Sequence, residues 1–302
     1  MSEIALVTYA GLPDLDPDDR SLVPALAARG VRAAPVVWDD PDFDWSRPRM
    51  AFVRNPWDYY RRYDEFLAWA RATSAATLLV NPLRVLEWNL DKRYLVALAE
   101  AGLPVVPTLH LERGAEANLA ARLAERGWER AVVKPAVSAD SWETIVLAPG
   151  EVARGEEHLD RLLPERAMLV QPFLESVETS GERCLVFIDG EFSHAVRKNA
   201  LTQGGRWAGL PEGTAAEAAP DELEVARRVL ATACRLGGFE PPMYARVDLA
   251  RDLVGGREGQ EGRPLLLELE LSEPTLFLTT HAAGLERLAD AIVRRLARSA
   301  TY

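Results

Sequence analysis

The first 85 residues alternate apolar runs of strand type with helical patterns. These segments fall, in chain order, at residues 4–10, 21–30, 32–38, 50–54, 60–72 and 76–82. Strands joined by crossover helices run parallel, because each helix returns the chain to the end of the sheet where the previous strand began. We therefore expect residues 1–86 to form a small α/β domain around a parallel sheet. The dinucleotide-binding pattern GxGxxG does not follow its first strand.

An acidic loop follows the first strand of this domain. Asp14, Asp16 and Asp18 have the spacing of a calcium-binding loop. Asp19 stands where such a loop needs glycine, and Ala25 stands where it needs glutamate, so the calcium pattern is incomplete. We expect a solvated loop instead.

The third strand of the domain is followed by two charged residues. Arg54 and Asp58 lie in the segment VRNPWDY, at the carboxyl end of the strand at 50–54. Open parallel sheets place their ligands outside this end of the strands. Both residues are therefore candidates for substrate binding, and ordinary surface charges are the alternative.

Two lysines lie where an anion could bind. In EWNLDKRYLVALAEAGLP (87–104), Asn89 can cap a helix, and Lys92 would then fall in the first turn, where it opposes the helix dipole. Backbone amides at a helix start bind anions, so Lys92 and these amides could hold a phosphate together. Lys134 follows two valines, precedes Pro135 and leads into a run of small residues that could close over a phosphate. A solvent-exposed position is the alternative for both lysines.

A β-hairpin is expected in GERCLVFIDGEFSHAVRK (181–198). Two alternating strands flank the dipeptide DG, which is a strong signal for a two-residue turn. Glu182 opens the first strand, whereas His194 and Lys198 share one side of the second. None of the four histidines has the spacing of a metal-binding pair, so we expect His194 to be a sheet-surface or core residue.

Four charged residues converge in two predicted C-terminal strands. In MYARVDLA, Arg246 and Asp248 are two residues apart and share a strand face. Glu268 and Glu270 do the same in PLLLELELSEP. If the strands are neighbours, three carboxylates meet on a partly buried surface, where their repulsion calls for a cation. Oxygen ligands favour a hard cation such as Mg²⁺, which commonly takes one or two carboxylates together with substrate phosphates. The alternative is an amphipathic hairpin with a solvated acidic face.

The net charge of −11 restricts the partners of the chain. Nucleic acids and anionic membranes attract basic surfaces, so we expect neither as a partner. The two cysteines, Cys184 and Cys234, provide no disulfide framework. The N-terminus carries Glu3 where a signal peptide needs basic residues, and no apolar run is long enough to span a bilayer. We therefore expect a cytoplasmic protein.

The order of these features resembles the ATP-grasp superfamily of carboxylate–amine ligases. A lysine near a helix start, VVKP before a small-residue loop, an apolar strand with QPFL, an acidic residue, RVD and ELE follow one another. The segments WNLDKRYL, VVKPAVSA and FSHAVRK are similar to the D-cycloserine synthetase branch. The resemblance implies an ATP-grasp fold of three parts: an N-terminal parallel-sheet domain (1–86), a small central lid (87–168) and a C-terminal, mostly antiparallel sheet domain (169–302).

The resemblance also implies a role for each matched residue. Lys92 and Lys134 would bind the phosphates of ATP. Asp248, Glu268 and Glu270 would hold Mg²⁺, with Mn²⁺ as a substitute, although many members have asparagine in place of Glu270. The remaining implied positions are Ser138 and Ser141 in a phosphate loop where many relatives have glycines, Gln171, Phe173 and Leu174 beside adenine, and Glu182 at the ribose. Arg246 could meet the phosphates. Lys198 and Arg206 could hold a carboxylate or the acylphosphate, and ordinary surface charges are the alternative for these two.

The implied reaction is an ATP-dependent ligation. ATP would convert a small amino-acid-like carboxylate into an acylphosphate, which an amine of the same or another molecule would attack, and a lid at 129–150 would exclude water. Two alternatives remain open: a phosphotransferase that releases a phosphorylated small molecule, and a nucleotide-binding protein without turnover. The expected partners are ATP and the amino-acid-like substrate, and a homodimer is a further expectation.

Overall fold

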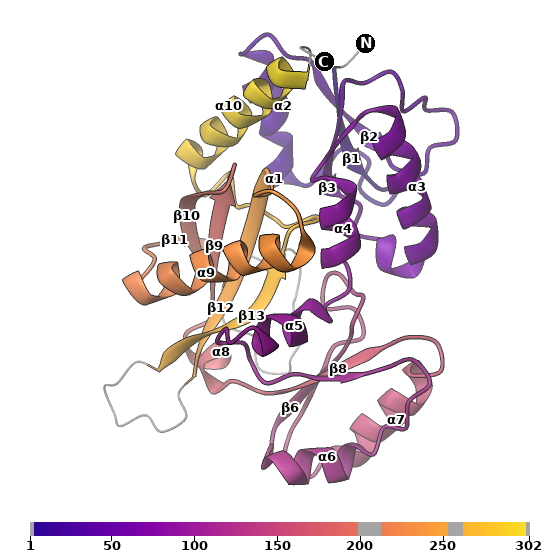
Figure 1. Ribbon diagram of the computed structural model, residues 1–302, viewed down its shortest axis with the longest axis vertical. Helices are drawn as coiled ribbons and strands as arrows, with labels where there is room; N and C mark the ends of the chain where they lie inside the picture. The colour runs from indigo at the N-terminus through magenta and orange to yellow at the C-terminus, as the bar shows by residue number, and fades with distance from the viewer. Residues whose placement is uncertain (1–2, 199–212, 253–261, 300–302) are drawn as a thin grey trace.

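The computed structural model describes residues 3–198, 213–252 and 262–299. Within these ranges the chain forms three sheets, which we call A, B and C (Figure 1). Sheet A belongs to the N-terminal part of the chain, sheet C to its middle and sheet B to its C-terminal part. The mixed α/β architecture expected from the sequence is confirmed.

Sheet A is the parallel sheet that the alternating pattern predicts. Its strand order is β2-β1-β3-β4, and its strands pair in parallel. The apolar runs of β1 and β3 are buried throughout, as expected for adjacent central strands of a covered sheet. The elements of this part are β1 (Ile4–Thr8), α1 (Pro17–Arg20), α2 (Leu22–Ala27), β2 (Ala33–Val37), β3 (Met50–Asn55), η1 (Tyr59–Arg61), α3 (Tyr63–Ala76) and β4 (Leu78–Val80).

Sheet C is antiparallel, with the order β5-β8-β6-β7, and α6 and α7 lie on its outer side (Figure 1). Leu123 of α6 and Leu159 of α7 share an apolar core with Val133 of β6. The boundary expected at 168/169 falls within β8, which pairs with the other strands of this sheet. The elements are β5 (Leu109–Leu111), α6 (Leu119–Arg126), β6 (Ala131–Pro135), β7 (Ile145–Leu147), α7 (Val152–Leu162) and β8 (Met168–Pro172).

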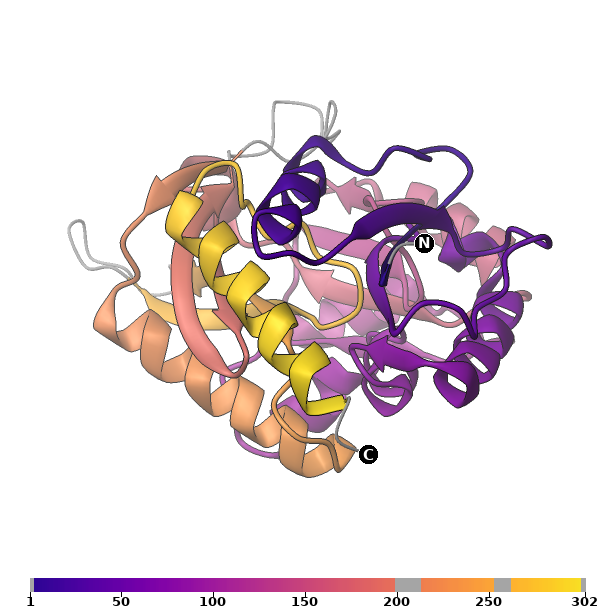
Figure 2. The ribbon, with the colours of Figure 1, turned by 90° about the horizontal axis from the view of Figure 1, so that it is seen from above.

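Sheet B has the order β11-β10-β9-β12-β13 and separates two long helices, α9 and α10 (Figure 2). Alternate residues of β9 explain this layering, since Leu185 and Phe187 join the core of α9 while Val186 and Ile188 join the core of α10. The elements are α8 (Glu175–Thr179), β9 (Glu182–Ile188), β10 (Glu191–Lys198), β11 (Gly213–Ala216), α9 (Pro220–Gly237), β12 (Tyr244–Asp252), β13 (Arg263–Glu270) and α10 (Ala282–Ser299).

The strand pairing of sheet B brings the predicted charged residues together. β9 and β10 form the expected hairpin, with Glu182 opposite Lys198. β12 and β13 are antiparallel neighbours. Arg246 lies opposite Glu270 and Asp248 lies opposite Glu268, so the shared strand face predicted from the sequence is confirmed.

The prediction of one helix that starts after Asn89 is wrong. Two shorter helices occupy the region, α4 (Leu83–Asn89) and α5 (Tyr94–Glu100). Asn89 ends α4 rather than capping a helix start, because its side chain is buried against β13, where it donates to the carbonyl of Leu269 and accepts from the backbone N–H of Leu271. Lys92 therefore lies in the break between two helices, and the domain boundary expected at 86/87 falls inside α4.

The acidic loop after β1 is only partly solvated, contrary to expectation, because Asp14 is exposed whereas Asp16 and Asp18 are buried. Asp16 caps α1 by accepting from the backbone N–H of Asp18 at 2.8 Å. Asp18 accepts from the backbone N–H of Thr279, and Asp19 is fully buried in an ion pair with Arg54. Asp18 and Asp19 are buried because they join the N-terminal part of the chain to the segment before α10, a contact that local sequence does not reveal.

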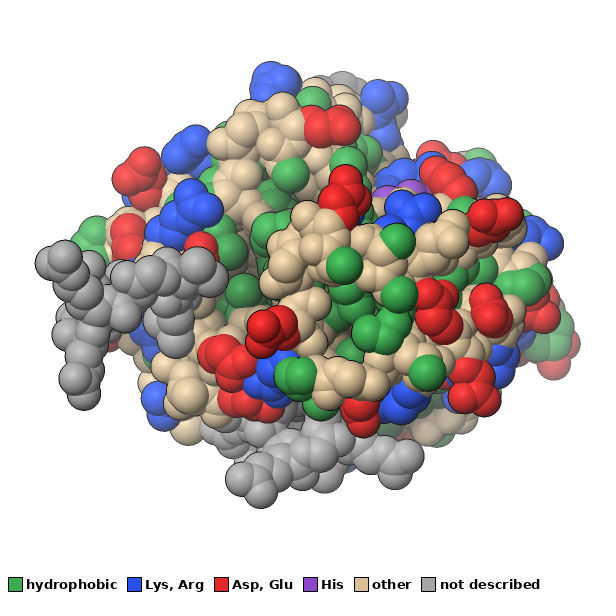
Figure 3. Space-filling view, turned by 90° about the horizontal axis from the view of Figure 1, so that it is seen from below, with side chains coloured by type: hydrophobic (Ala, Val, Ile, Leu, Met, Phe, Trp, Pro, Cys, Tyr) green, Lys and Arg blue, Asp and Glu red, His purple; other side chains and the backbone are tan. Residues whose placement is uncertain are grey.

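The surface carries charges of both signs. On the face in Figure 3, acidic and basic side chains are interspersed with apolar ones. Arg130, for example, pairs at the surface with both Glu175 and Glu178. None of the helices in the described ranges combines the length and apolar character that crossing a membrane requires.

Candidate active site

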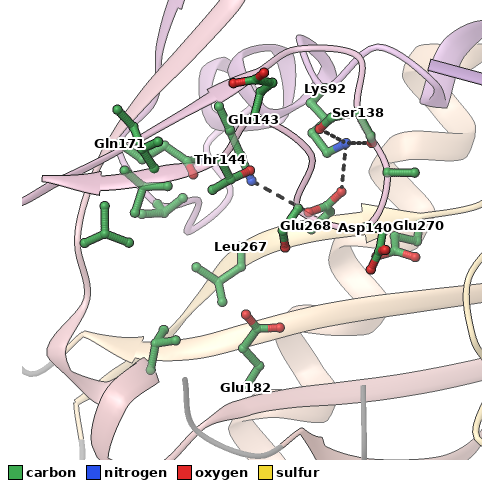
Figure 4. Close-up of a pocket in the computed structure, with 18 of the residues that line it drawn as sticks. Lys92, Ser138, Asp140, Glu143, Thr144, Gln171, Glu182, Leu267, Glu268 and Glu270 are labelled. Carbon is green, nitrogen blue, oxygen red and sulfur yellow. Dashed lines mark hydrogen bonds and ion pairs between the residues drawn. The ribbon is translucent and has the colours of Figure 1, made fainter. Parts of the chain in front are cut away.

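A cavity of about 980 Å³ lies between sheet C and the charged face of sheet B (Figure 4). All three parts of the chain contribute to its walls. Tyr59 comes from the N-terminal part, Lys134 from β6 of sheet C, and Glu268 from β13 of sheet B. A cavity at the junction of separate structural units is the usual place for a small-molecule site.

The lysines of the chain are concentrated in this cavity. The sequence contains only three, Lys92, Lys134 and Lys198, and all three line the cavity. Lysines are normally among the most exposed residues, yet only 6% of Lys92 and 8% of Lys198 are accessible. The ammonium groups of this residue type are therefore confined to one cavity, and their role in binding a ligand stays a prediction.

Lys92 and Lys134 both form ion pairs with Glu268, and Figure 4 shows the pair with Lys92. The Nζ atom of Lys92 lies 3.2 Å from one oxygen of Glu268, and that of Lys134 lies 3.7 Å from the other. Lys92 also donates to the carbonyl of Ser138 at 2.6 Å, so it connects the loop after β6 to sheet B. A phosphate that entered here would find two ammonium groups already directed into the cavity.

A second group of alternating charges continues along sheet B. Lys198 contacts Glu182 at 3.1 Å and Asp248 at 2.8 Å. Arg246 holds both oxygens of Asp248, at 2.8 and 2.9 Å, and also donates to Glu270. Each of these carboxylates is therefore neutralised by a neighbouring lysine or arginine.

The pKa values of the carboxyl groups divide into two classes. Burial would raise the pKa of Asp248, but the charges of Arg246 and Lys198 hold it below its usual value. Burial likewise opposes ionisation of Glu268, and the charges of Lys92 and Lys134 prevail, so its pKa is also lowered.

Glu270 and Glu273 form the second class. Burial raises the pKa of each to about 7. For Glu270, the charge of Arg246 opposes the rise without cancelling it. These two carboxyl groups therefore carry less negative charge at neutral pH than Asp248 and Glu268.

The donor set fits a hard cation. Asp248 and Glu268 are ionised and supply oxygen atoms only, as Mg²⁺ prefers. Within the described ranges, one group of three potential ligands lies within 4.8 Å, namely Glu182, Cys184 and Asp248. Burial raises the pKa of the Cys184 thiol well above its usual value, so it stays protonated and is a poor ligand. The predicted set of Asp248, Glu268 and Glu270 does not form such a group among the described residues, and Asp248 and Glu268 alone supply the ionised oxygen ligands that Mg²⁺ prefers.

The predicted adenine segment forms an apolar wall of the cavity. Gln171, Phe173 and Leu174 all line it, at and beyond the end of β8. The guanidinium of Arg130 lies 3.9 Å from the centre of the Phe173 ring. The backbone N–H of Phe173 already donates to the carbonyl of Arg130, whereas the Gln171 amide donates to the Thr108 hydroxyl at 2.9 Å.

The loop after β6 closes over the cavity. Ser138 and Ser141 both line the cavity, as expected for a phosphate loop. Trp142 packs on the Tyr60 ring of the N-terminal part, with 4.9 Å between ring centres, and the guanidinium of Arg166 lies 4.6 Å from its ring centre. The loop is thus held against the N-terminal part by its tryptophan.

The predicted substrate residues lie elsewhere. Arg54 is fully buried, pairs with Asp19 at 2.7 Å and does not line the cavity. Asp58 accepts from the indole of Trp38 and from Arg62, and it does not line the cavity either. Arg206 lies outside the described residues.

Tyr59 and Glu273 are among the lining residues that the sequence did not single out. Tyr59 follows Asp58 by one residue but turns into the cavity, because it begins the 3-10 helix η1. Glu273 lies three residues beyond the end of β13, so the alternation that revealed Glu268 and Glu270 does not extend to it. The segment SEP was the only local signal for a turn there.

Comparison with known proteins places this geometry in a family. The family described as "D-cycloserine synthetase DcsG, N-terminal domain" matches residues 4–81. The cycloserine biosynthesis protein DcsG of Streptomyces lavendulae is 36% identical over 311 residues, which cover 98% of this chain and 99% of that protein. The crystal structure of D-cycloserine synthetase DcsG is similar with a TM-score of 0.89, again at 36% identity, and the match covers 97% of this chain and 99% of that one.

More distant structures share the fold. The ATP-grasp ligase PsnB, complexed with a minimal precursor, has a TM-score of 0.64 at 19% identity, with 97% and 99% coverage. The D-alanine–D-alanine ligase of Bacillus anthracis, complexed with ATP, has a TM-score of 0.65 at 13% identity, with 99% and 98% coverage. The resemblance drawn from the sequence is confirmed: this chain is an ATP-dependent ligase with the ATP-grasp fold and belongs to the D-cycloserine synthetase DcsG family.

Proposed function

We propose that this enzyme uses ATP to activate the carboxylate of a small amino acid as an acylphosphate and then joins it to an amine, which in the preferred case belongs to the same molecule. The products are ADP, phosphate and a cyclic amide. The name of the relative DcsG suggests the ring of D-cycloserine. Opening the amide bond of that ring gives a serine whose side-chain oxygen carries nitrogen, and this is the substrate class that we propose.

The observation that carries the proposal is the convergence of all three lysines on one cavity. Transfer of the γ-phosphoryl group of ATP concentrates negative charge, and most catalysis comes from positioned cations that offset it. Lys92 and Lys134 lie at the entrance to the charged face, and Lys198 with Arg246 lies farther along it.

The predicted Mg²⁺ would be held by Asp248 and Glu268, where it would neutralise phosphate charge and orient the phosphates. When phosphates and the cation bind, Lys92 and Lys134 can exchange Glu268 for phosphate oxygens. Lys198 and Arg246 can likewise turn from Asp248 toward the carboxylate that is activated. Glu270 remains paired with Arg246 and positions it, which accounts for glutamate at a position where many ATP-grasp ligases have asparagine.

The residues around the cavity also explain how water is excluded. The loop after β6 is fastened to the N-terminal part by Trp142 and Tyr60, and the hydroxyl of Tyr59 donates to the carbonyl of Ser138 at 3.2 Å. Closure of such a loop protects an acylphosphate from hydrolysis. An amine tethered to the same molecule then reacts without the entropy cost of a second encounter.

Product stoichiometry tests this function. With D-serine derivatives that carry nitrogen on the side-chain oxygen, we expect equal amounts of ADP, phosphate and cyclic amide, without a second amine. Hydroxylamine should divert part of the product to a hydroxamate, because it attacks acylphosphates. If a phosphorylated product accumulated in an amount equal to that of ADP, without free phosphate, the enzyme would instead be a phosphotransferase.

Removing a lysine should affect the nucleotide and not the fold. Lys134→Ala is expected to weaken ATP binding by a factor of about 10–100, because a hydrogen bond to a charged group contributes about 1.5–3 kcal/mol. Its melting temperature should change little, since the ammonium group serves a ligand. Titration calorimetry with ATP and Mg²⁺ checks the affinity, and Arg228→Ala, on the exposed side of α9, is the matched control. Unchanged affinity in Lys134→Ala would remove this lysine from the phosphate site.

A further inference from the structure

The segment that follows β13 is held in place through its backbone. Four successive carbonyl groups accept hydrogen bonds from side chains of other elements. Tyr244 donates to the carbonyl of Ser272 at 2.8 Å, and Trp57 donates to that of Glu273 at 3.0 Å. Arg54 donates to the carbonyl of Pro274 at 2.6 Å, and Arg246 donates to that of Thr275 at 2.9 Å.

Three of these donors are themselves immobilised by burial. Arg54 and Tyr244 are completely buried, and only 3% of Arg246 is accessible. A backbone segment in which four successive carbonyl groups are bound by side chains, three of them buried, has little freedom to shift. The direction of the Glu273 side chain, which lines the cavity, is therefore fixed by the fold.

The carboxyl group of Glu273 lies next to the hydroxyl of Tyr59 at the edge of the cavity. Tyr59 is only 2% accessible, and its hydroxyl also reaches the carbonyl of Ser138 in the loop that closes the cavity. Burial and the charge of Glu270 raise the pKa of Glu273 to about 7, although the charge of Lys92 opposes this rise. Glu273 thus occupies a tight, acidic corner.

Glu273 differs from the other acidic residues on the charged face of the cavity. Glu182, Asp248, Glu268 and Glu270 each form an ion pair with a lysine or arginine. Among the residues that the structure describes, no lysine, arginine or histidine forms an ion pair with Glu273. Asp140 also lines the cavity without an ion pair in the described ranges, but it is exposed on the closing loop and can be solvated by water.

We propose that Glu273, beside Tyr59 at the edge of the cavity, binds the ammonium group of the amino-acid substrate. This inference rests on the proposed function, because it assigns the amine end of the same substrate whose carboxylate is activated. No lysine or arginine among the described residues forms an ion pair with Glu273, although the charge of Lys92 acts on it, and an ammonium group supplies the charge and the hydrogen-bond donors that the carboxylate needs. The phosphate-binding lysines remain free for ATP.

The arrangement also explains selection for an amino acid over a simple carboxylic acid. A carboxylic acid without the amine would leave Glu273 half-buried and unpaired, which penalises its binding. Arg54, which does not contact the cavity, would act as a positioning residue, since it holds the carbonyl of Pro274 next to Glu273.

Two rings that differ only in the amine provide the test. D-cycloserine carries a primary amine, and isoxazolidin-3-one is the same ring without it. In the presence of ADP and Mg²⁺, we expect the wild-type enzyme to bind D-cycloserine about 10- to 100-fold more tightly than isoxazolidin-3-one. Glu273→Gln should abolish most of this difference, with the affinity for isoxazolidin-3-one and for ADP unchanged.

Two controls accompany the measurement. Glu224→Gln, on the exposed side of α9, should behave as wild type, and Glu273→Asp should retain part of the preference because it keeps the charge. Unchanged ADP affinity and melting temperature show that each variant is folded.

The outcomes separate this inference from the proposed function. If the wild-type enzyme prefers D-cycloserine and Glu273→Gln keeps that preference, the assignment of Glu273 is overturned while the ligase function stands. If Glu273→Gln loses turnover but still prefers D-cycloserine, the assignment is also overturned, because Glu273 would then act in the chemical step and not in binding the amine. If neither ring binds to the wild-type enzyme, the cyclic product is wrong, and this inference is overturned with it.

Discussion

Glu268→Gln is expected to lower turnover by a factor of about 10²–10³, which is the usual cost of deleting one preorganised electrostatic group. Its carboxylate forms ion pairs with Lys92 and Lys134, at 3.2 and 3.7 Å, where the proposed function places the phosphates and the predicted Mg²⁺. Glutamine keeps the volume of the side chain but deletes the charge that holds a cation and orients the two lysines.

Steady-state ADP release measures this effect, with Mg²⁺ varied over a wide range. Higher Mg²⁺ should restore part of the activity, because the variant loses affinity for the cation as well as charge. Glu286→Gln, on the exposed side of α10, is the matched control and should keep full activity. If Glu268→Gln turned over as fast as the wild-type enzyme at limiting Mg²⁺, β13 would not belong to the phosphate-transfer site.

Asp248→Asn is expected to destabilise the fold by about 3–5 kcal/mol, the usual cost of removing one partner from a buried ion pair. Asp248 is 2% accessible and is bound by Arg246 and Lys198, which are also buried. Without its charge, two buried cations lose their shared counterion. Turnover should fall too, so stability must be measured independently of activity.

Urea denaturation at several pH values provides that measurement. The folded-state pKa of Asp248 is lowered by its cationic neighbours, so the stability that it contributes is present above the ordinary carboxyl pKa of about 4 and is lost as pH falls below it. The difference between wild type and Asp248→Asn should therefore shrink on acidification. Asp290→Asn, in an exposed pair with Arg29, should cost less than about 1 kcal/mol. Equal midpoints for wild type and Asp248→Asn at neutral pH would contradict the account.

Local pattern was sufficient to predict the strands that carry the charged face. The alternation in β12 and β13 placed Arg246, Asp248, Glu268 and Glu270 correctly, because a period of two assigns side chains to faces wherever a strand stays regular. The parallel sheet A and the β9–β10 hairpin followed from equally local signals, namely alternating strand and helix patterns and a DG turn.

Long-range contacts set the limit of prediction. The burial of Asp19 depends on Arg54, 35 residues away, and Arg54 in turn reaches the carbonyl of Pro274, 220 residues away. Asn89 ends a helix because β13 accepts its side chain, 180 residues later. Glu273 escaped notice for the same reason, since side chains remote in sequence fix its backbone. Such contacts cannot be predicted from residue type and spacing.

The transfer of oxygen from substrate to phosphate tests the central claim most directly. If the carboxylate of the substrate is labelled with ¹⁸O and becomes an acylphosphate, the attack of the amine leaves one of its oxygen atoms on the departing phosphate. Mass spectrometry should then find one ¹⁸O atom in each phosphate released with product, and none when the reaction runs without labelled substrate. Unlabelled phosphate, formed together with ADP and cyclic amide from fully labelled substrate, would contradict activation of the carboxylate by phosphorylation.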